Sequence, residues 1–239
     1  MVQINGWMSI PDPYANALFA RVGWDSVTLD AQHGLFDERA LVATLQALGD
    51  KTPRRLVRVA WNEAALIGKA LDFGADGVIV PLVNSVDDAR RVADACRFPP
   101  TGTRSFGPGP AALRAGGLSY ESLANQIEAW AMIETAQALD AVKDIAAVPG
   151  IDGLFVGPND LALSLGLPSG SNREEPQMIA AFEEIIAAAK AAGKLCGIFC
   201  TNAAYARRMA KLGFSMVTAA VDTSVLTEAA ARVVTEVRA

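Results

Sequence analysis

The chain has 239 residues, a formal net charge of −5, and a composition of 51% hydrophobic and 20% charged residues. This balance supports a large buried core and argues against a disordered chain. Basic pairs such as Arg54-Arg55 and Arg90-Arg91 are scattered along the chain rather than gathered in one stripe. We therefore expect solvated helix faces at these pairs and exclude nucleic acid as a partner.

The first residues do not resemble a secretory signal peptide, because no basic residue precedes Arg21 and no small-residue cleavage pattern is present. No apolar stretch approaches the roughly 18 residues that span a bilayer, so no membrane partner is expected. Cys96, Cys196 and Cys200 are odd in number and lack the spacing of metal ligands. Reduced, buried thiols in a cytoplasmic protein are the simplest interpretation.

The chain alternates short apolar runs with longer segments in which apolar residues recur at helical spacing. The predicted strands cover residues 4–9, 24–31, 55–60, 77–82, 129–134, 153–158, 195–200 and 214–221. The predicted helices cover residues 13–22, 37–48, 63–73, 85–96, 135–147, 177–191, 202–212 and 223–237. Gly74 and Gly193 are predicted to end helices, and Asn62, Asn202 and Asp222 to cap helix starts.

The strand pattern indicates a parallel sheet, because runs such as 77–82 are continuously apolar and so are buried on both faces. Eight strand–helix units in one domain, residues 1–239, predict an α/β fold of the (β/α)8 or TIM-barrel type. An open doubly wound sheet is the alternative, but no G-x-G-x-x-G follows the first strand. The long connections 98–118 and 166–176 are expected to be lids or oligomer contacts. Whether Arg104 in the first of them faces the site stays open.

Polar residues at the carboxyl ends of the strands are the candidates for a site, since barrel active sites lie there. They are Asp30 and His33 after the second strand, Arg58 on the third, Glu134 after the fifth, Asp160 after the sixth and Asp222 after the eighth. Each carboxylate and His33 has an ordinary alternative as a turn, cap, ion-pair or loop residue, and Asp222 is interpreted as a helix N-cap. An ordinary structural role is less expected for Arg58, because an arginine inside a strand needs an anion or a solvated cleft.

Together these residues suit chemistry on a small anion. Two carboxylates with open positions suit Mg²⁺, Mn²⁺ or Co²⁺, and such an ion can polarise a carbonyl group. Arg58 offers a fork of donors to an oxyanion. His33 can accept a proton near neutral pH, and Asp30 could orient it.

A Schiff-base mechanism is disfavoured, because it needs a lysine at the carboxyl end of a strand. Lys51, Lys69, Lys143, Lys190 and Lys211 fall in predicted helices or their flanks, and Lys194 precedes the seventh strand. The loops after the last two strands also lack the glycine-rich turn that grips a phosphate in many barrels, so a sugar phosphate is a weaker candidate substrate.

Five segments, residues 24–33, 57–62, 99–104, 133–140 and 150–161, carry a resemblance that extends over nearly the whole chain. They resemble the metal-dependent (class II) pyruvate aldolases of the HpcH/HpaI type, such as 4-hydroxy-2-oxoheptanedioate aldolase and the 2-keto-3-deoxy sugar-acid aldolases. The last two segments place Glu134 and Asp160 26 positions apart.

The resemblance implies a metal and substrate site built from these segments. Glu134 and Asp160 would bind the divalent cation, and a 2-keto acid would chelate it through its keto and carboxylate oxygens. Gly157, Pro158 and Asn159 would approach the substrate carboxylate by their backbone amides.

The resemblance also implies roles in proton transfer and assembly. Arg58 would contact the keto or enolate oxygen, and His33, backed by Asp30, would assist a metal-bound water in proton transfer. Asp72 matches a position that reaches the site of a neighbouring subunit. A homo-oligomer is implied, a hexamer built as a trimer of dimers that exchange their C-terminal helix.

The implied activity is a lyase that cleaves 4-hydroxy-2-keto acids to pyruvate or hydroxypyruvate and an aldehyde through a metal-bound enolate. An acyl-CoA lyase of the malyl- or citramalyl-CoA type is the alternative enzyme, although such chains tend to carry an additional C-terminal segment. A barrel that only binds keto acids or acts as a scaffold is the alternative without catalysis. Met132 departs from the family pattern, because many members have a substrate-contacting glutamine there, and this departure concerns specificity.

Overall fold

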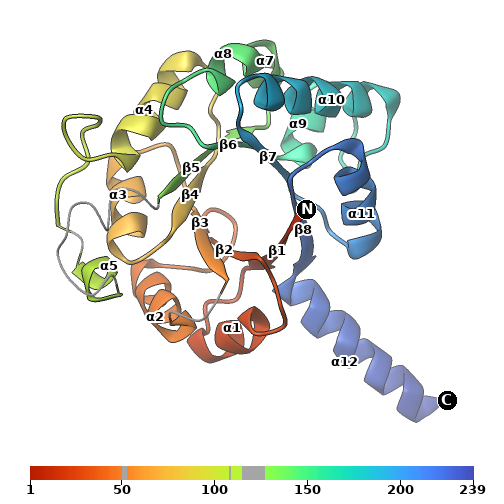
Figure 1. The fold of residues 1–239 in the computed structure, drawn as a ribbon. Coiled ribbons are helices and arrows are strands. Elements are labelled where there is room, and N and C mark those ends of the chain that lie inside the picture. Colours follow the sequence, from red (N-terminus) through yellow and green to blue (C-terminus); the bar gives the residue numbers. More distant parts are fainter. Residues whose placement is uncertain (50–52, 108, 115–126) are drawn as a thin grey trace.

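The computed structural model describes residues 1–49, 53–107, 109–114 and 127–239. Its eight parallel strands pair in chain order and β8 pairs back onto β1, so the sheet closes into a barrel (Figure 1). The strands are β1 (Gln3–Met8), β2 (Ser26–Asp30), β3 (Arg54–Arg58), β4 (Gly77–Val80), β5 (Glu128–Ile133), β6 (Gly153–Val156), β7 (Leu195–Ile198) and β8 (Met216–Val221). The predicted (β/α)8 barrel is confirmed.

Helices surround the barrel, and the last of them, α12, extends away from it (Figure 1). They are α1 (Pro13–Ala20), α2 (Glu38–Leu48), α3 (Ala64–Asp72), α4 (Val86–Cys96), α5 (Gly109–Arg114), α7 (Ala136–Asp140), α8 (Val142–Ala146), α9 (Pro158–Ser164), α10 (Pro176–Ala191), α11 (Ala203–Leu212) and α12 (Asp222–Arg238). Among the residues described, no helix is long and apolar enough to cross a membrane.

Three segments differ from the sequence prediction. The single helix expected over 135–147 is two short helices, α7 and α8. The connection 98–118 contains α5, and its residues 108 and 115–118 lie outside the described residues. The sixth strand ends at Val156, and Pro158 begins α9, because proline is favoured at the first position of a helix.

The predicted helix caps are confirmed in part. The Asn202 side chain accepts the Tyr205 N–H, as an N-cap should. The prediction for Asn62 is wrong, because α3 follows Glu63 and the Asn62 amide donates to the Asp88 carbonyl instead. Asp222 is also not the cap, since it is the first residue of α12 and its carboxylate accepts the backbone N–H groups of Ser9 and Ile10.

The core has two parts that match the two faces of the barrel strands. Outward-facing residues pack beneath the helices, as in the doubly covered sheet that continuous apolar runs predict. The barrel interior is filled by Trp7, Leu56, Ile79, Trp130, Met132, Phe155 and Met216. Gly153 leaves room for Trp130, because a Cβ on this glycine would lie 2.3 Å from the indole ring. These side chains form the floor on which the site at the barrel mouth rests.

Helix α12 extends away from the barrel rather than packing into the ring of helices (Figure 1). It carries a set of exposed apolar residues, Val225, Leu226, Val233, Val234 and Val237. The Asp222 carboxylate at its root binds the backbone just after β1 at 2.9 Å. Exchange of this helix between subunits stays a prediction. The exposed apolar residues of α12 are a surface that such an exchange would cover.

Candidate active site

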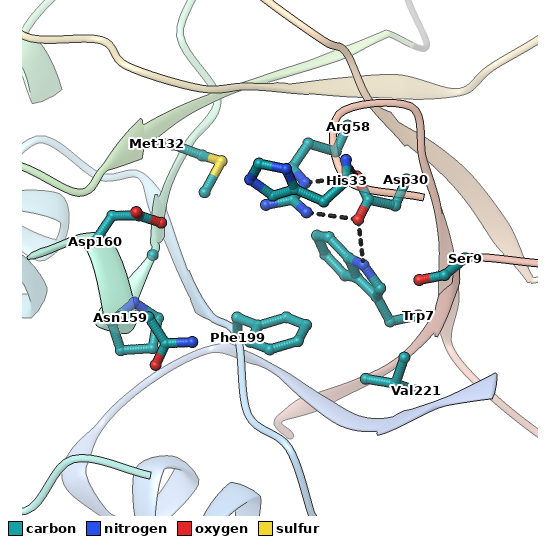
Figure 2. Close-up of a pocket in the computed structure, with 12 residues that line it drawn as sticks. Trp7, Ser9, Asp30, His33, Arg58, Met132, Asn159, Asp160, Phe199 and Val221 are labelled. Carbon is teal, nitrogen blue, oxygen red and sulfur yellow. Dashed lines mark hydrogen bonds and ion pairs between the residues drawn. The ribbon is translucent and has the colours of Figure 1, made fainter. Parts of the chain in front are cut away.

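A cavity of about 260 Å³ opens at the carboxyl ends of the strands, where barrel active sites lie. Figure 2 shows the side chains that converge on it from several strand ends. The lining residues are Trp7, Ser9, Asp30, His33, Arg58, Met132, Gly157, Pro158, Asn159, Asp160, Phe199 and Val221. Eight of them are residues expected at the site from the sequence: Asp30, His33, Arg58, Met132, Gly157, Pro158, Asn159 and Asp160.

Arg58 and Asp30 form a two-point ion pair at the right of the cavity in Figure 2. Arg58 Nε donates to Asp30 Oδ1 at 2.9 Å, and Arg58 Nη2 donates to Oδ2 at 2.5 Å. The two side chains come from neighbouring strands in register, since Asp30 is the partner of Arg58 in the β2–β3 ladder. The anion that an arginine inside a strand requires is therefore a carboxylate of the protein itself.

Asp30 stays ionised although it is only 2% exposed. Burial alone would raise the pKa of this carboxyl, but the hydrogen bonds and charge of Arg58 and the backbone N–H groups of His33 and Gln32 lower it below its ordinary value. The site thus keeps a fixed, ionised carboxylate whose charge is matched by the guanidinium.

His33 lies in the loop after β2 and is an exposed residue at the cavity, with its ring drawn beside Arg58 in Figure 2. The expected support of its imidazole by Asp30 is corrected in one respect. Asp30 Oδ1 accepts the backbone N–H of His33 at 3.1 Å, and its other partners are Arg58, Trp7 and the Gln32 backbone. Asp30 therefore fixes the loop that carries His33 rather than the imidazole ring.

Glu134 follows β5 directly and is only 3% exposed. Its Oε1 accepts the backbone N–H of Leu82 at 2.7 Å, and Leu82 has a left-handed backbone with φ of 54°. Such a conformation is unfavourable for leucine, so the hydrogen bond from this N–H to the carboxylate is made at the expense of backbone strain in the β4–α4 loop. Burial, and then the nearby charge of Asp160, raise the pKa of Glu134 above its ordinary value.

Asp160 lies in the first turn of α9 and is exposed to the cavity from the side opposite Asp30 (Figure 2). It is close enough to Glu134 for the two charges to repel each other. A buried carboxylate beside a second one suits a divalent cation, which would relieve both the burial cost and the repulsion. Within the described ranges no third His, Cys, Asp or Glu joins them, so substrate and water oxygens would complete the coordination.

The backbone of the β6–α9 turn passes close to Glu134 at Gly157. A Cβ on this residue would lie 2.7 Å from Glu134 Oε2 and 3.1 Å from the Met132 methyl group. Only glycine lets the turn approach the carboxylate this closely. The turn therefore brings Asp160 and Glu134 to one place.

The expected grip on a substrate carboxylate by three backbone amides needs a correction. Gly157 N–H already donates to the Ile133 carbonyl at 3.3 Å, and Pro158 has no N–H to donate. Asn159 is the first residue of this turn whose backbone N–H lies in the unbonded first turn of α9. Pro158 lines the cavity with its ring only.

Asp72 and Arg104 lie away from this cavity. Asp72 ends α3 in the outer ring of helices, where its Oδ1 accepts Arg104 Nη2 at 2.6 Å. The Arg104 guanidinium also stacks on Phe98 at 4.5 Å. Arg104 thus faces Asp72 rather than the site of its own chain, and Asp72 could serve a site only in a neighbouring copy.

The structure supports the argument from the lysines as far as it describes them. Lys69, Lys143, Lys190 and Lys211 lie in helices, and Lys194 precedes β7 at the amino end of the barrel. Lys51 lies outside the described residues. No lysine lines the cavity among the residues described.

Sequence reasoning missed four lining residues: Trp7, Ser9, Phe199 and Val221. Each lies at or just after the carboxyl end of β1, β7 or β8. Strand alternation could have identified Trp7, because residues two apart in a strand lie on the same face and Asn5 is buried inside the barrel. An apolar residue in an apolar strand is normally assigned to the core, which concealed the role of Trp7, Phe199 and Val221, whereas Ser9 is a polar residue at the carboxyl end of the predicted strand 4–9 and could have been found.

A closed barrel with an ion pair, a histidine and two carboxylates at the carboxyl ends of its strands has the arrangement of TIM-barrel enzymes. The chain belongs to the HpcH/HpaI aldolase/citrate lyase family, whose model matches residues 3–229. This confirms the family that the sequence segments resemble.

Relatives agree with this assignment. A hydroxypyruvate/pyruvate aldolase of Rhizorhabdus wittichii is 38% identical over 98% of this chain and 93% of its own length. A 4-hydroxy-2-oxo-heptane-1,7-dioate aldolase of Salmonella paratyphi A is 35% identical over 95% of this chain and 87% of its own. A solved HpcH/HpaI aldolase/citrate lyase family protein of Burkholderia cenocepacia is 32% identical, with a TM-score of 0.91 over 100% of this chain and 95% of that one.

Proposed function

We propose that the protein is a divalent-metal-dependent aldolase that reversibly cleaves 4-hydroxy-2-keto acids to pyruvate or hydroxypyruvate and an aldehyde. The observation that carries the proposal is the convergence of Asp160 and the Arg58–Asp30 pair on one cavity, with the buried carboxylate of Glu134 near enough to Asp160 for their charges to interact. The curated relatives are named for aldolase reactions of 2-keto acids, which supports the same donor class.

Glu134 and Asp160 would hold the cation, which when bound acts as a Lewis acid on a carbonyl and stabilises negative charge beside it. Mg²⁺, Mn²⁺ and Co²⁺ all suit this oxygen-rich pair. Arg58 uses Nε and Nη2 on Asp30 and turns the rest of its guanidinium toward the cavity, where it can donate to the keto oxygen as that oxygen gains charge. His33 lines the same cavity and would accept the proton from the carbon next to the carbonyl, through one water.

We further propose a homo-oligomer, a trimer of dimers. The exposed apolar side of α12 would be covered by a second copy of the chain. Asp72, on the outer helix ring and half-buried against Arg104, would approach the cavity of a neighbour. The exposed apolar side of α12 supports a second copy of this chain as the partner.

The reaction is tested most directly by proton exchange, which needs no choice of aldehyde. In deuterated buffer with Mn²⁺, the protein should exchange the methyl protons of pyruvate, followed by nuclear magnetic resonance. EDTA should stop the exchange and added Mn²⁺ should restore it. Exchange that continues at full rate in excess EDTA would refute the metal mechanism.

Met132 is the position where a change should alter substrate affinity. Its side chain is 1% exposed, lines the cavity and approaches the Gly157–Glu134 contact. We expect Met132→Gln to lower the KM for the keto acid roughly fivefold with little change in kcat, since a new hydrogen bond contributes about 1 kcal/mol. Steady-state kinetics would measure this, and Met132→Leu, which adds no polar group, should leave the KM near the wild-type value.

A further inference from the structure

We propose that Trp7 is a positioning residue for the Arg58–Asp30 pair, holding the guanidinium in the orientation in which it meets the substrate. The proposal deepens the function proposed above and rests on it. Trp7 contacts both members of the pair and is 1% exposed, so its indole cannot move without repacking the barrel interior.

The first contact fixes the acid. Trp7 Nε1 donates to Asp30 Oδ2 at 3.3 Å, and the same oxygen accepts Arg58 Nη2 at 2.5 Å (Figure 2). Asp30 Oδ1 is occupied by Arg58 Nε and two backbone N–H groups. Of the donors to Oδ2, the indole is the only one besides the guanidinium among the described residues. It therefore keeps this oxygen directed at Arg58.

The second contact supports one face of the guanidinium. Arg58 Cζ lies 4.9 Å from the Trp7 ring centroid, within the range of a cation–π interaction. The side chain of Arg58 is 11% exposed, so this contact is largely shielded from water. Trp7 thus supports the plane of the guanidinium while Asp30 holds one edge, and the remaining edge faces the cavity.

The indole is itself held by aromatic neighbours. It stacks on Phe155 with a centroid distance of 5.8 Å and meets Phe199 edge to face at 5.1 Å. Phe155 belongs to the filled barrel interior and Phe199 lines the cavity. The position of the guanidinium is therefore set by the rigid interior of the barrel rather than by a loop, which is how a charged group is preorganised for catalysis.

Trp130 supplies a matched control for this role. It is also fully buried in the barrel interior, and its Nε1 donates to a carboxylate, Glu128 Oε2, at 3.0 Å. Glu128 begins β5 and so lies at the amino end of the barrel, away from the cavity. Trp130→Phe removes the same kind of donor from the same kind of environment without touching Arg58.

The test compares Trp7→Phe, Trp7→Leu and Trp130→Phe. Trp7→Phe keeps a ring under the guanidinium and loses the donor, and should lower kcat for pyruvate proton exchange roughly tenfold with little change in KM. Trp7→Leu loses both contacts and should lower kcat roughly a hundredfold. Mn²⁺ affinity, measured by calorimetry, should be unchanged in both, and Trp130→Phe should retain wild-type kcat.

A double-mutant cycle separates positioning from a general structural effect. If Trp7 acts through Arg58, Trp7→Phe should cost less than threefold in an Arg58→Lys background, where the guanidinium fork is gone. An equal cost in both backgrounds, or a Trp7→Phe variant that behaves like Trp130→Phe, would overturn the proposal. If the wild-type protein shows no exchange, the proposed function fails, and a crystal structure of Trp7→Phe then decides: an unmoved Arg58 guanidinium would overturn the positioning role.

Discussion

Replacing Arg58 with alanine should lower kcat about a thousandfold, in the range found when a preorganised donor to a developing oxyanion is removed. The physical reason is that Arg58 is the cation that lines the cavity among the described residues, and the part of its guanidinium that Asp30 does not bind would donate to the keto oxygen as that oxygen gains charge. Divalent-metal affinity should persist, since the side chain lies on β3 and the two proposed ligands follow β5 and β6. Pyruvate proton exchange measures the first effect and calorimetry with Mn²⁺ the second.

Loss of Arg58 also leaves Asp30 buried without its counter-ion, which is expected to destabilise the fold by several kcal/mol. Arg55→Ala is the matched control, because Arg55 lies on the same strand and is buried in an ion pair with Asp76 at 3.0 Å. It should lose comparable stability and keep wild-type kcat per folded molecule. Full-rate proton exchange in Arg58→Ala would remove Arg58 from the mechanism.

The barrel could be predicted because its causes are local. Strands buried on both faces are continuously apolar, so an acid or arginine within or just after them is visible in the sequence. Alternation along β2 and β3 then places Asp30 and Arg58 on the same interior side, and the parallel register makes them neighbours. Asp30, His33, Arg58, Glu134 and Asp160 follow from these rules, whereas Met132 and residues 157–159 are expected only from the family resemblance.

The details that the sequence left open or did not predict depend on contacts between distant segments. The direction of Arg104 is set by Asp72 and Phe98, which precede it by 32 and 6 positions and come from different elements. The pairing of Asp30 with Arg58 rather than with the His33 ring depends on which donors the closed barrel brings nearest. Trp7 becomes important only because β1 lies beside β2, which places its indole under that ion pair.

The second large effect is expected at Glu134. Glu134→Gln should weaken Mn²⁺ binding by more than a hundredfold and abolish turnover, because the amide keeps the shape of the side chain but loses the charge that a hard cation requires. The bond to the Leu82 N–H can be retained by the amide oxygen, so the β4–α4 loop should stay in place. Glu128→Gln, at the other end of β5, is the control that should bind metal and turn over normally.

The stability of the metal-free Glu134→Gln variant distinguishes a loss of metal binding from misfolding. Burial raises the pKa of Glu134 in the folded protein, so the ionised carboxylate opposes folding, and stability should fall as pH rises through the unfolded and then the folded pKa. Glu134→Gln removes that cost, and at pH 7 the metal-free variant should be at least as stable as the metal-free wild type. Added Mn²⁺ should then raise the Tm of the wild type and leave that of the variant unchanged, since only binding to the folded state stabilises it. A variant that gains the same Tm from Mn²⁺ as the wild type would show that Glu134 is not a ligand.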